Sequence, residues 1–217
     1  MINGAVKKGM LWAEFALLFF LVPYYYAFHH ESSPLSFLFL LGLSGFFFLY
    51  KNKSFRNHFF LNKQGWTKDI PRVLWIFVLV AIVLIALTHL FYPEFLFYCP
   101  THHFSLWLSL MVIYPLLSVY PQELIYRAFL FHRYRPLLQN ERSLIHLSAI
   151  AFAFGHIIYF HPISIILTFF GGYLFAWTYA KTQSLLAVSF EHALYGCLLY
   201  TIGLGRFFYT GFDKLLH

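Results

Sequence analysis

The most regular feature of the chain is a series of long apolar runs separated by short polar segments. A membrane-spanning helix needs about 20 mostly apolar residues, with roughly 17 to 25 tolerated. By this rule the sequence predicts seven membrane-spanning helices, over residues 10–28, 34–50, 71–92, 104–131, 143–160, 162–180 and 184–204. The run Phe207–Tyr209 either extends the last helix or begins an interfacial tail, so the alternative count is eight. We therefore expect an all-α, polytopic membrane helix bundle that forms a single integral membrane domain over residues 1–217.

The amino-acid composition agrees with a membrane protein. Hydrophobic residues make up 60% of the chain and charged residues 11%, whereas soluble domains are about half apolar and a quarter charged. The two cysteines, Cys99 and Cys197, form neither a disulfide framework nor a CxxC metal pair. A net charge of +7 could suggest nucleic acid, but the basic residues cluster between the predicted spans. We therefore expect membrane lipid as a partner and no nucleic acid, and the sequence does not indicate an oligomeric state.

The distribution of basic residues predicts the orientation of the bundle. Loops on the cytoplasmic side of a membrane protein are enriched in Lys and Arg. With the N-terminus in the cytoplasm, all 15 Lys and Arg residues except Arg206 and Lys214 fall on or near that side. We therefore expect a cytoplasmic N-terminus, in the plasma (inner) membrane of a bacterium. The basic and aromatic segment Lys51–Pro71 would be the longest cytoplasmic loop, lying on anionic headgroups.

Glu123 is the only acidic residue in its predicted span. A carboxylate at membrane depth is energetically expensive, and such residues usually mark a functional site. Arg127 follows four residues later, so on a helix the two side chains share a face and can pair. Pro115 and Pro121 interrupt the backbone hydrogen bonds just before Glu123. The pattern favours a polar, hydrated pocket beside Glu123, and the alternative is an ion pair and a kink that serve packing alone.

Two histidines, His156 and His192, lie in other apolar runs. A single intramembrane histidine is more often a hydrogen-bonded packing residue than a catalyst. One carboxylate and two imidazoles from three spans would share the cost of burial if they met in one hydrated pocket. At about 1.5 Å per residue, Glu123 lies roughly 15 Å from the cytoplasmic edge, His192 roughly 12 Å and His156 roughly 21 Å. His156 therefore fits a common depth least well.

The chemistry of these groups suggests hydrolysis. A Glu and a His together can activate water as a general base, and a second His can donate a hydrogen bond to a developing oxyanion. The same set could ligate Zn²⁺ and leave one position open for water. The chain has no HExxH motif, the strongest local sign of such a site. No cofactor is firmly implied, and a zinc ion held by Glu123, His156 and His192 is the alternative.

Three short motifs occur in order along these apolar runs. They are Gln122-Glu123-xxx-Arg127, Phe152-xxx-His156 and His192-xxx-Gly196. Their order and spacing resemble the CPBP family of intramembrane proteases, which includes type II CAAX prenyl endopeptidases and bacteriocin-immunity-type proteins. The family pattern is EExxxR, then FxxxH, then HxxxN, and the resemblance covers about residues 100–200. It implies that the first Glu and the His of the second motif activate water. It also implies that the second Glu braces the Arg, and that the third motif holds the oxyanion.

Two positions depart from this pattern. Gln122 replaces the first Glu and cannot act as a base, and Gly196 replaces the Asn and removes an oxyanion donor. Three explanations remain open. Glu123 takes over as base, or Glu191 supplies the missing carboxylate, or the protein is a non-catalytic relative that binds a membrane partner.

We favour a variant active site. The chain would be an intramembrane endopeptidase of the glutamic or metallo type, hydrolysing a peptide bond near the cytoplasmic membrane face in a peptide or membrane-anchored protein. Glu123 and His156 would activate water, and His192 would stabilise the oxyanion. Gln122 would position water or substrate, and Arg127 would brace Glu123. The alternatives are a binding, scaffold or immunity protein with the same fold, and a transporter or proton relay, although no transporter-like internal repeat is evident.

Overall fold

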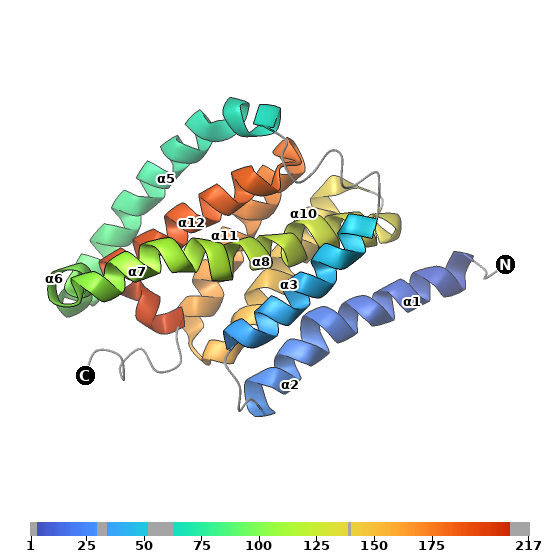
Figure 1. Cartoon of the computed structure of the whole chain (residues 1–217), viewed down its shortest axis with the longest axis horizontal. Coiled ribbons are helices and arrows are strands. Elements are labelled where there is room, and N and C mark those ends of the chain that lie inside the picture. Colours follow the sequence, from blue (N-terminus) through green and yellow to red (C-terminus); the bar gives the residue numbers. More distant parts are fainter. Residues whose placement is uncertain (1–3, 30–33, 52–62, 139, 209–217) are drawn as a thin grey trace.

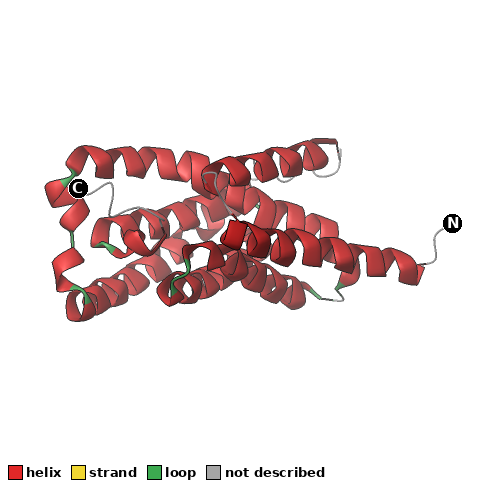
Figure 2. Ribbon diagram, turned by 90° about the horizontal axis from the view of Figure 1, so that it is seen from below, coloured by secondary structure: helices red, strands yellow, loops and turns green. Residues whose placement is uncertain are grey.

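The structure is a computed structural model that describes residues 4–29, 34–51, 63–138 and 140–208. Figure 2 shows these residues as helices joined by short loops. The chain begins with a continuous helical unit made of α1 (Gly4–Ala16), the π-helical turn η1 (Leu17–Leu21) and α2 (Val22–His29). Next come α3 (Pro34–Lys51), α5 (Lys63–Phe91), η2 (Pro93–Phe95) and α6 (Tyr98–His102).

A long central helix, composed of several segments, crosses the middle of the bundle (Figure 1). Its segments are α7 (Phe104–Tyr114), η3 (Pro115–Val119), α8 (Tyr120–Glu123), η4 (Leu124–Phe129) and α9 (Leu130–Tyr134). The turns η3 and η4 are π-helical, and η3 begins at Pro115. Proline cannot donate the backbone hydrogen bond of a regular helix. The predicted interruptions beside Glu123 are therefore present, as widened turns within a continuous helix.

The last part of the chain forms the helices that carry both site histidines. After η5 (Arg135–Leu137) come α10 (Glu141–Gly155), the 3₁₀ turn η6 (His156–Tyr159), α11 (Pro162–Thr182), α12 (Leu185–Ile202) and η7 (Leu204–Phe208). The connections are short, and α12 begins with an N-cap in which the Ser184 hydroxyl accepts a hydrogen bond from the Ala187 amide at 3.2 Å. Gly172 allows α10 and α11 to approach closely, since a Cβ there would lie 3.1 Å from the Cα of Ala149.

The all-α membrane fold expected from the sequence is confirmed. Within the described residues, five helices are long and apolar enough to cross a membrane: Thr67–Phe91, Phe104–Leu137, Glu141–Tyr159, Pro162–Thr182 and Leu185–Ile202. They coincide with the last five predicted spans. The first two predicted spans, 10–28 and 34–50, are helical as α1–α2 and α3. That these two cross the membrane stays a prediction.

The predicted loop Lys51–Pro71 is wrong in its second half. Helix α5 begins at Lys63 and contains Pro71, whereas residues 52–62 lie outside the described part of the chain. The first turns of α5 are polar, so a rule that searches for apolar runs places its start too late. At the other end, η7 ends at Phe208, and Tyr209 lies outside the described residues.

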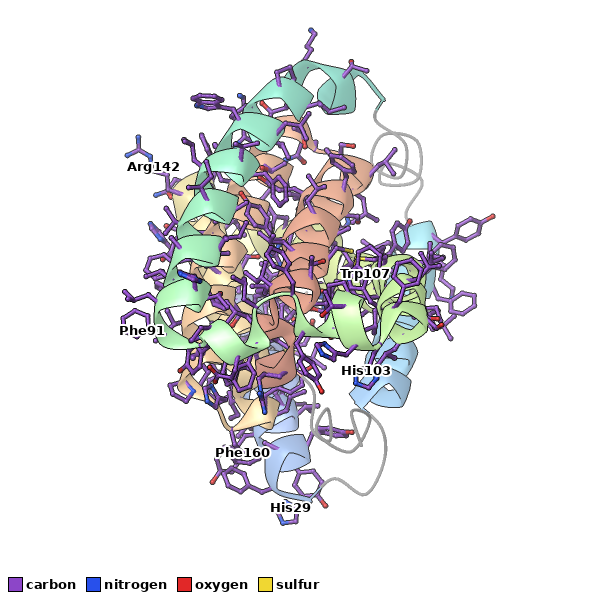
Figure 3. The ribbon with its side chains drawn as sticks, turned by 90° about the vertical axis from the view of Figure 1, so that its left-hand side faces the viewer. His29, Phe91, His103, Trp107, Arg142 and Phe160 are labelled. Carbon is purple, nitrogen blue, oxygen red and sulfur yellow. The ribbon has the colours of Figure 1, made fainter. Side chains whose placement is uncertain are left out.

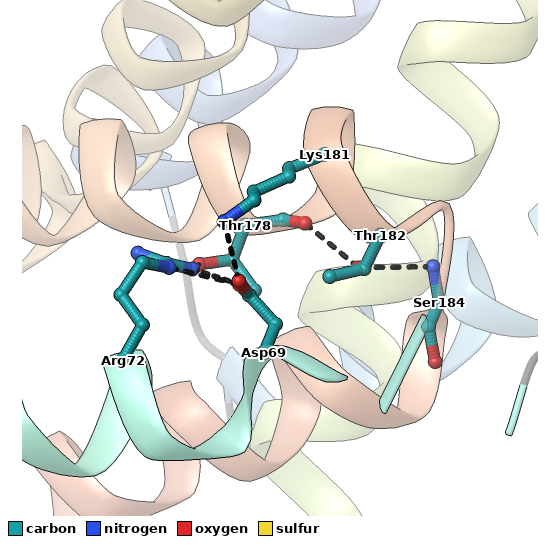
Figure 4. A network of polar contacts seen from close by, with 6 residues as sticks. All are labelled: Asp69, Arg72, Thr178, Lys181, Thr182 and Ser184. Atoms are coloured by element: carbon teal, nitrogen blue, oxygen red, sulfur yellow. Dashed lines mark hydrogen bonds and ion pairs between the residues drawn. The ribbon is translucent and has the colours of Figure 1, made fainter. Parts of the chain in front are cut away.

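A polar network fixes the start of α5 to the end of α11 (Figure 4). The Asp69 carboxylate accepts hydrogen bonds from Lys181 Nζ at 2.7 Å and from Arg72 Nε at 2.9 Å, with a second, closer contact to Arg72 Nη2. Arg72 Nη2 also donates to Thr178 Oγ1 at 2.7 Å, and its guanidinium lies over the Trp177 ring. Asp69 is buried and contacts both cations, so it joins Arg72 of α5 to Lys181 of α11.

We predict that Asp69→Asn lowers the free energy of unfolding by about 1–3 kcal/mol, the usual effect of removing a charged acceptor from partly buried donors. Thermal unfolding of the purified protein in detergent micelles, followed by tryptophan fluorescence, measures the change. Glu94→Gln is the matched control, because Glu94 is exposed in η2. Equal stability of the two variants would contradict a structural role for Asp69.

Candidate active site

Glu123 and Arg127 form a completely buried ion pair. Glu123 Oε2 lies 3.1 Å from Arg127 Nε, and both side chains have 0% exposure. Arg127 Nη2 also donates to the Gly172 carbonyl of α11 at 3.3 Å, and its guanidinium stacks over the Phe152 ring at 4.4 Å. The pair predicted from the i, i+4 spacing is therefore present. It is closed off by aromatic rings and by the α11 backbone.

The second oxygen of Glu123 holds His192. Glu123 Oε1 accepts a hydrogen bond from His192 Nδ1 at 2.7 Å. A carboxylate only accepts hydrogen bonds, so Nδ1 carries the proton and Nε2 of the neutral imidazole keeps its lone pair. The His192 ring also stacks on Phe175, with centroids 4.5 Å apart. Glu123 thus fixes both the tautomer and the orientation of His192.

His156 is oriented by the backbone of its own helix. It begins the 3₁₀ turn η6, and its Nδ1 donates to the Phe152 carbonyl at 2.7 Å. Its Nε2 therefore also keeps a lone pair. The rings of His156 and His192 both pack against Phe152, with centroid distances of 4.6 Å and 5.5 Å. The side chain of His156 points back over the preceding turn, which offsets the poor depth match expected from residue counting.

Gln122, His156 and His192 line a common pocket of about 500 Å³. Its wall is otherwise mostly aliphatic and aromatic, with contributions from α5, α7, η3, α11, α12 and η7. Gln122 Nε2 donates to Ser118 Oγ at 2.8 Å, and its buried Oε1 has no hydrogen-bond partner. The pocket therefore presents two imidazole acceptors and one amide in an apolar surrounding.

Glu123 itself does not line this pocket. Both of its oxygens are occupied, one by Arg127 and one by His192, and its exposure is zero. The expectation that Glu123 contacts and activates water directly therefore does not fit the geometry. The burial that makes the residue conspicuous in the sequence also keeps it out of the pocket, which it borders only through His192.

Glu191 does not supply the missing carboxylate. It is fully buried near Thr178 and Arg72 of the α5–α11 network, its two oxygens have no hydrogen-bond partner, and it does not line the pocket. Adjacent helical residues point about 100° apart. His192 lines the pocket and Glu191 does not.

The alternative of a zinc site finds no support in the arrangement of the side chains. Within the described residues, no three His, Cys, Asp or Glu side chains are grouped closely enough to hold a metal ion. Glu123 already uses its two oxygens for other partners. The residues present do not fit the expected zinc ligand set.

The pocket lies in the half of the bundle that is farther from the basic loops. It is lined by the end of α10, the first half of α11 and the end of α12. Figure 3 shows Arg142, at the start of α10, and Phe160, just after η6, toward opposite ends of the molecule. A basic end in the cytoplasm therefore places the pocket in the outer half, so the predicted orientation and the predicted cytoplasmic opening do not agree.

Sequence reasoning missed three residues that shape the site: Tyr114, Ser118 and Phe175. Tyr114 and Ser118 precede Gln122 by eight and four residues on the same long helix, so helical spacing could have placed them on its face. The Tyr114 hydroxyl lies 3.2 Å from His192 Nε2. Nothing in the sequence marks Phe175, since it lies in an ordinary apolar run and its role depends on helix packing.

Comparison with known proteins gives one match. Residues 103–198 match a family model described as Rce1-like, the type II CAAX prenyl endopeptidases. This match supports the resemblance to the CPBP family that the three motifs indicate. No curated protein and no solved structure shows significant similarity to the chain. The matched region contains all three motifs and every residue predicted for the site.

The ion pair between Glu123 and Arg127 can be tested with a double-mutant cycle. We predict that Arg127→Met lowers the free energy of unfolding by about 3–5 kcal/mol, because it leaves the Glu123 charge without its cation. Adding Glu123→Gln removes that charge, and the double variant should regain part of the loss. Reversible unfolding in mixed micelles measures all three variants.

Arg142→Met is the matched control, since Arg142 is an exposed arginine at the start of α10. A double variant whose loss equals the sum of the two single losses would show that Glu123 and Arg127 do not stabilise one another.

Proposed function

We propose that the protein is an intramembrane endopeptidase in which Glu123 orients His192 as the general base. The observation that carries this proposal is the 2.7 Å contact between Glu123 Oε1 and His192 Nδ1 at the wall of the apolar pocket. A carboxylate that holds an imidazole in one tautomer, with the other ring nitrogen toward the substrate, is the arrangement that hydrolases use to activate a nucleophile. The family match adds support, since the Rce1-like family is one of proteases.

Hydrolysis would proceed by addition of water and loss of an amine. His192 Nε2 takes one proton from a water molecule as its oxygen bonds to the scissile carbonyl carbon, and the carbonyl oxygen becomes an oxyanion. The same nitrogen then returns the proton to the leaving nitrogen as the C–N bond breaks. His156 Nε2 accepts a hydrogen bond from the other water hydrogen and so positions the water. The products are one carboxyl group and one amine, as hydrolysis requires.

The remaining residues would support these steps. Arg127 braces Glu123 and neutralises its charge. Gln122, whose Oε1 is unpaired and whose amide contacts Ser118, positions the substrate backbone. Glutamine cannot take a proton, so the base in this chain is an imidazole and not the first carboxylate of the family pattern.

The pocket suits a substrate with an apolar, membrane-held group. Its wall consists mainly of aliphatic and aromatic side chains, among them Val80 and Leu84 of α5. The volume of about 500 Å³ is of the size that binds a small ligand or a long apolar chain. We infer a peptide that carries a lipid, or an apolar membrane-spanning segment, as the substrate class.

A second function is favoured by Gln122 and Gly196, the two departures from the family motifs. A CPBP fold without these groups could bind a membrane partner, as a scaffold or immunity protein, without cutting it. Loss of cleavage on removal of the histidines decides between the two functions.

We predict that Glu123→Gln, His156→Ala and His192→Ala each reduce cleavage by at least a hundredfold while the protein stays folded in the membrane. Purified protein in phospholipid vesicles is given prenylated peptides and single-span apolar peptides, and mass spectrometry identifies the products. Glu191→Gln is the matched control, because Glu191 is also a buried glutamate but lies outside the pocket. Cleavage that survives all three site variants would leave the binding function as the better explanation.

We also predict that Leu84→Trp narrows the pocket and makes KM depend more strongly on the length of the lipid. A larger side chain at this position should raise KM more for a geranylgeranylated peptide than for a farnesylated one, with a smaller effect on kcat. Val83→Trp is the matched control, because Val83 is 55% exposed on the outer face of α5 and does not line the pocket. Equal KM changes for the two variants would contradict binding of the lipid in this pocket.

A further inference from the structure

Gly196 lies where the family pattern has an asparagine, and Tyr114 occupies the space that a side chain at 196 would need. A Cβ built on Gly196 would overlap three atoms of the Tyr114 phenol: its hydroxyl oxygen, Cζ and Cε1. These are ring atoms, so the overlap could be relieved only by displacing the whole aromatic side chain. The Tyr114 side chain can therefore occupy this position only because residue 196 is a glycine.

The Tyr114 hydroxyl also lies beside the proposed base. It is 3.2 Å from His192 Nε2, and the ring packs edge-on against both His192 and Tyr200. Because the proton of His192 is on Nδ1, the resting hydrogen bond runs from the Tyr114 hydroxyl to Nε2. The hydroxyl is therefore a donor held at the nitrogen that would meet water.

Two other hydroxyls of the pocket already have hydrogen-bond partners, whereas the buried Tyr195 hydroxyl has none and no contact to His192 Nε2. Thr168 donates to the Ser164 carbonyl at 2.6 Å, and Ser118 accepts from Gln122. His156 and His192 present acceptors and not donors while they are neutral. An oxyanion that forms next to His192 needs a donor, and Tyr114 is the lining hydroxyl placed against that residue.

We propose that the Tyr114 hydroxyl is the oxyanion donor of this enzyme and takes the place of the asparagine that Gly196 replaces. The inference rests on the proposed peptidase function. His192 Nε2 has one lone pair, so the Tyr114 hydroxyl must turn away from it before Nε2 can take a proton from water. The hydroxyl proton is then free to turn toward the oxyanion that forms in the same step. No net proton is lost or gained by Tyr114, because its O–H bond stays intact throughout.

Tyr114→Phe tests this role by removing one oxygen atom from the site. We predict that kcat falls by about 10²- to 10³-fold, the usual loss for one oxyanion donor, while KM changes little. The assay uses the wild-type protein in vesicles with whichever prenylated or single-span peptide it cleaves. Tyr126→Phe is the matched control, because the Tyr126 hydroxyl lies against Gly155 in the same way but outside the pocket. It should leave kcat unchanged.

A rescue experiment separates a catalytic donor from a packing residue. Tyr114→Ala creates room at 196, so Tyr114→Ala/Gly196→Asn can place an amide donor where the phenol was. We predict that this double variant regains at least tenfold in kcat over Tyr114→Ala. The size control Tyr114→Ala/Gly196→Ala should regain none. Gly196→Asn alone should lose activity, since the tyrosine is displaced.

The outcomes distinguish the inference from the function on which it rests. Absence of cleavage by the wild-type protein overturns both. Wild-type cleavage with less than a tenfold fall in Tyr114→Phe overturns the inference alone, and so does equal recovery with Asn and Ala at position 196. Loss in Tyr114→Phe together with recovery by Asn alone supports it.

Discussion

The site depends on a single buried negative charge that two partners share. Glu123 has no contact with solvent, and its two oxygens meet Arg127 on one side and His192 on the other. Taking a carboxylate out of water costs several kcal/mol, and only close partners of good geometry offset that cost. The position of α12 is therefore coupled to the central helix at this point, because any displacement of His192 would leave the carboxylate under-satisfied. This constraint holds the His192 side chain in one orientation at the wall of the pocket.

The aromatic residues around the charge complete that rigidity. Phe152 lies under the Arg127 guanidinium and also contacts both site histidines, and Phe175 stacks on His192. Rings of this kind exclude water from the ion pair while leaving the pocket side of the imidazoles open. The same packing makes most of the pocket wall apolar, apart from Gln122, the imidazole edges and a few hydroxyl groups. One set of aromatic contacts therefore both encloses the ion pair and makes most of the pocket wall apolar.

Much of this site could be predicted from the sequence because charged groups in apolar runs are rare. The i, i+4 spacing predicted the Glu123–Arg127 pair. The free-energy cost of burying a lone carboxylate and a lone imidazole predicted that Glu123 and His192 lie close together. Which of these residues line the pocket could not be predicted, because that depends on which atoms face it and not on which residue types are present. The predicted start of α5 was too late for a related reason. The polar first turns of α5, which begin at Lys63, are held by tertiary contacts with α11, and these contacts leave no pattern in the local sequence.

The two departures from the family motifs have different consequences in the folded chain. The carboxylate missing at Gln122 is not replaced by another carboxylate, because Glu123 is enclosed and Glu191 faces the α5–α11 network. The proposed mechanism therefore assigns proton transfer to an imidazole, which the Glu123 contact orients. The asparagine missing at Gly196, by contrast, leaves a space that the phenol of Tyr114 fills from the neighbouring helix. A loss of function would be expected to leave vacant or randomly filled positions. Here one position is filled by a hydrogen-bond donor directed at the same imidazole that Glu123 orients, which is the arrangement expected of a rebuilt active site.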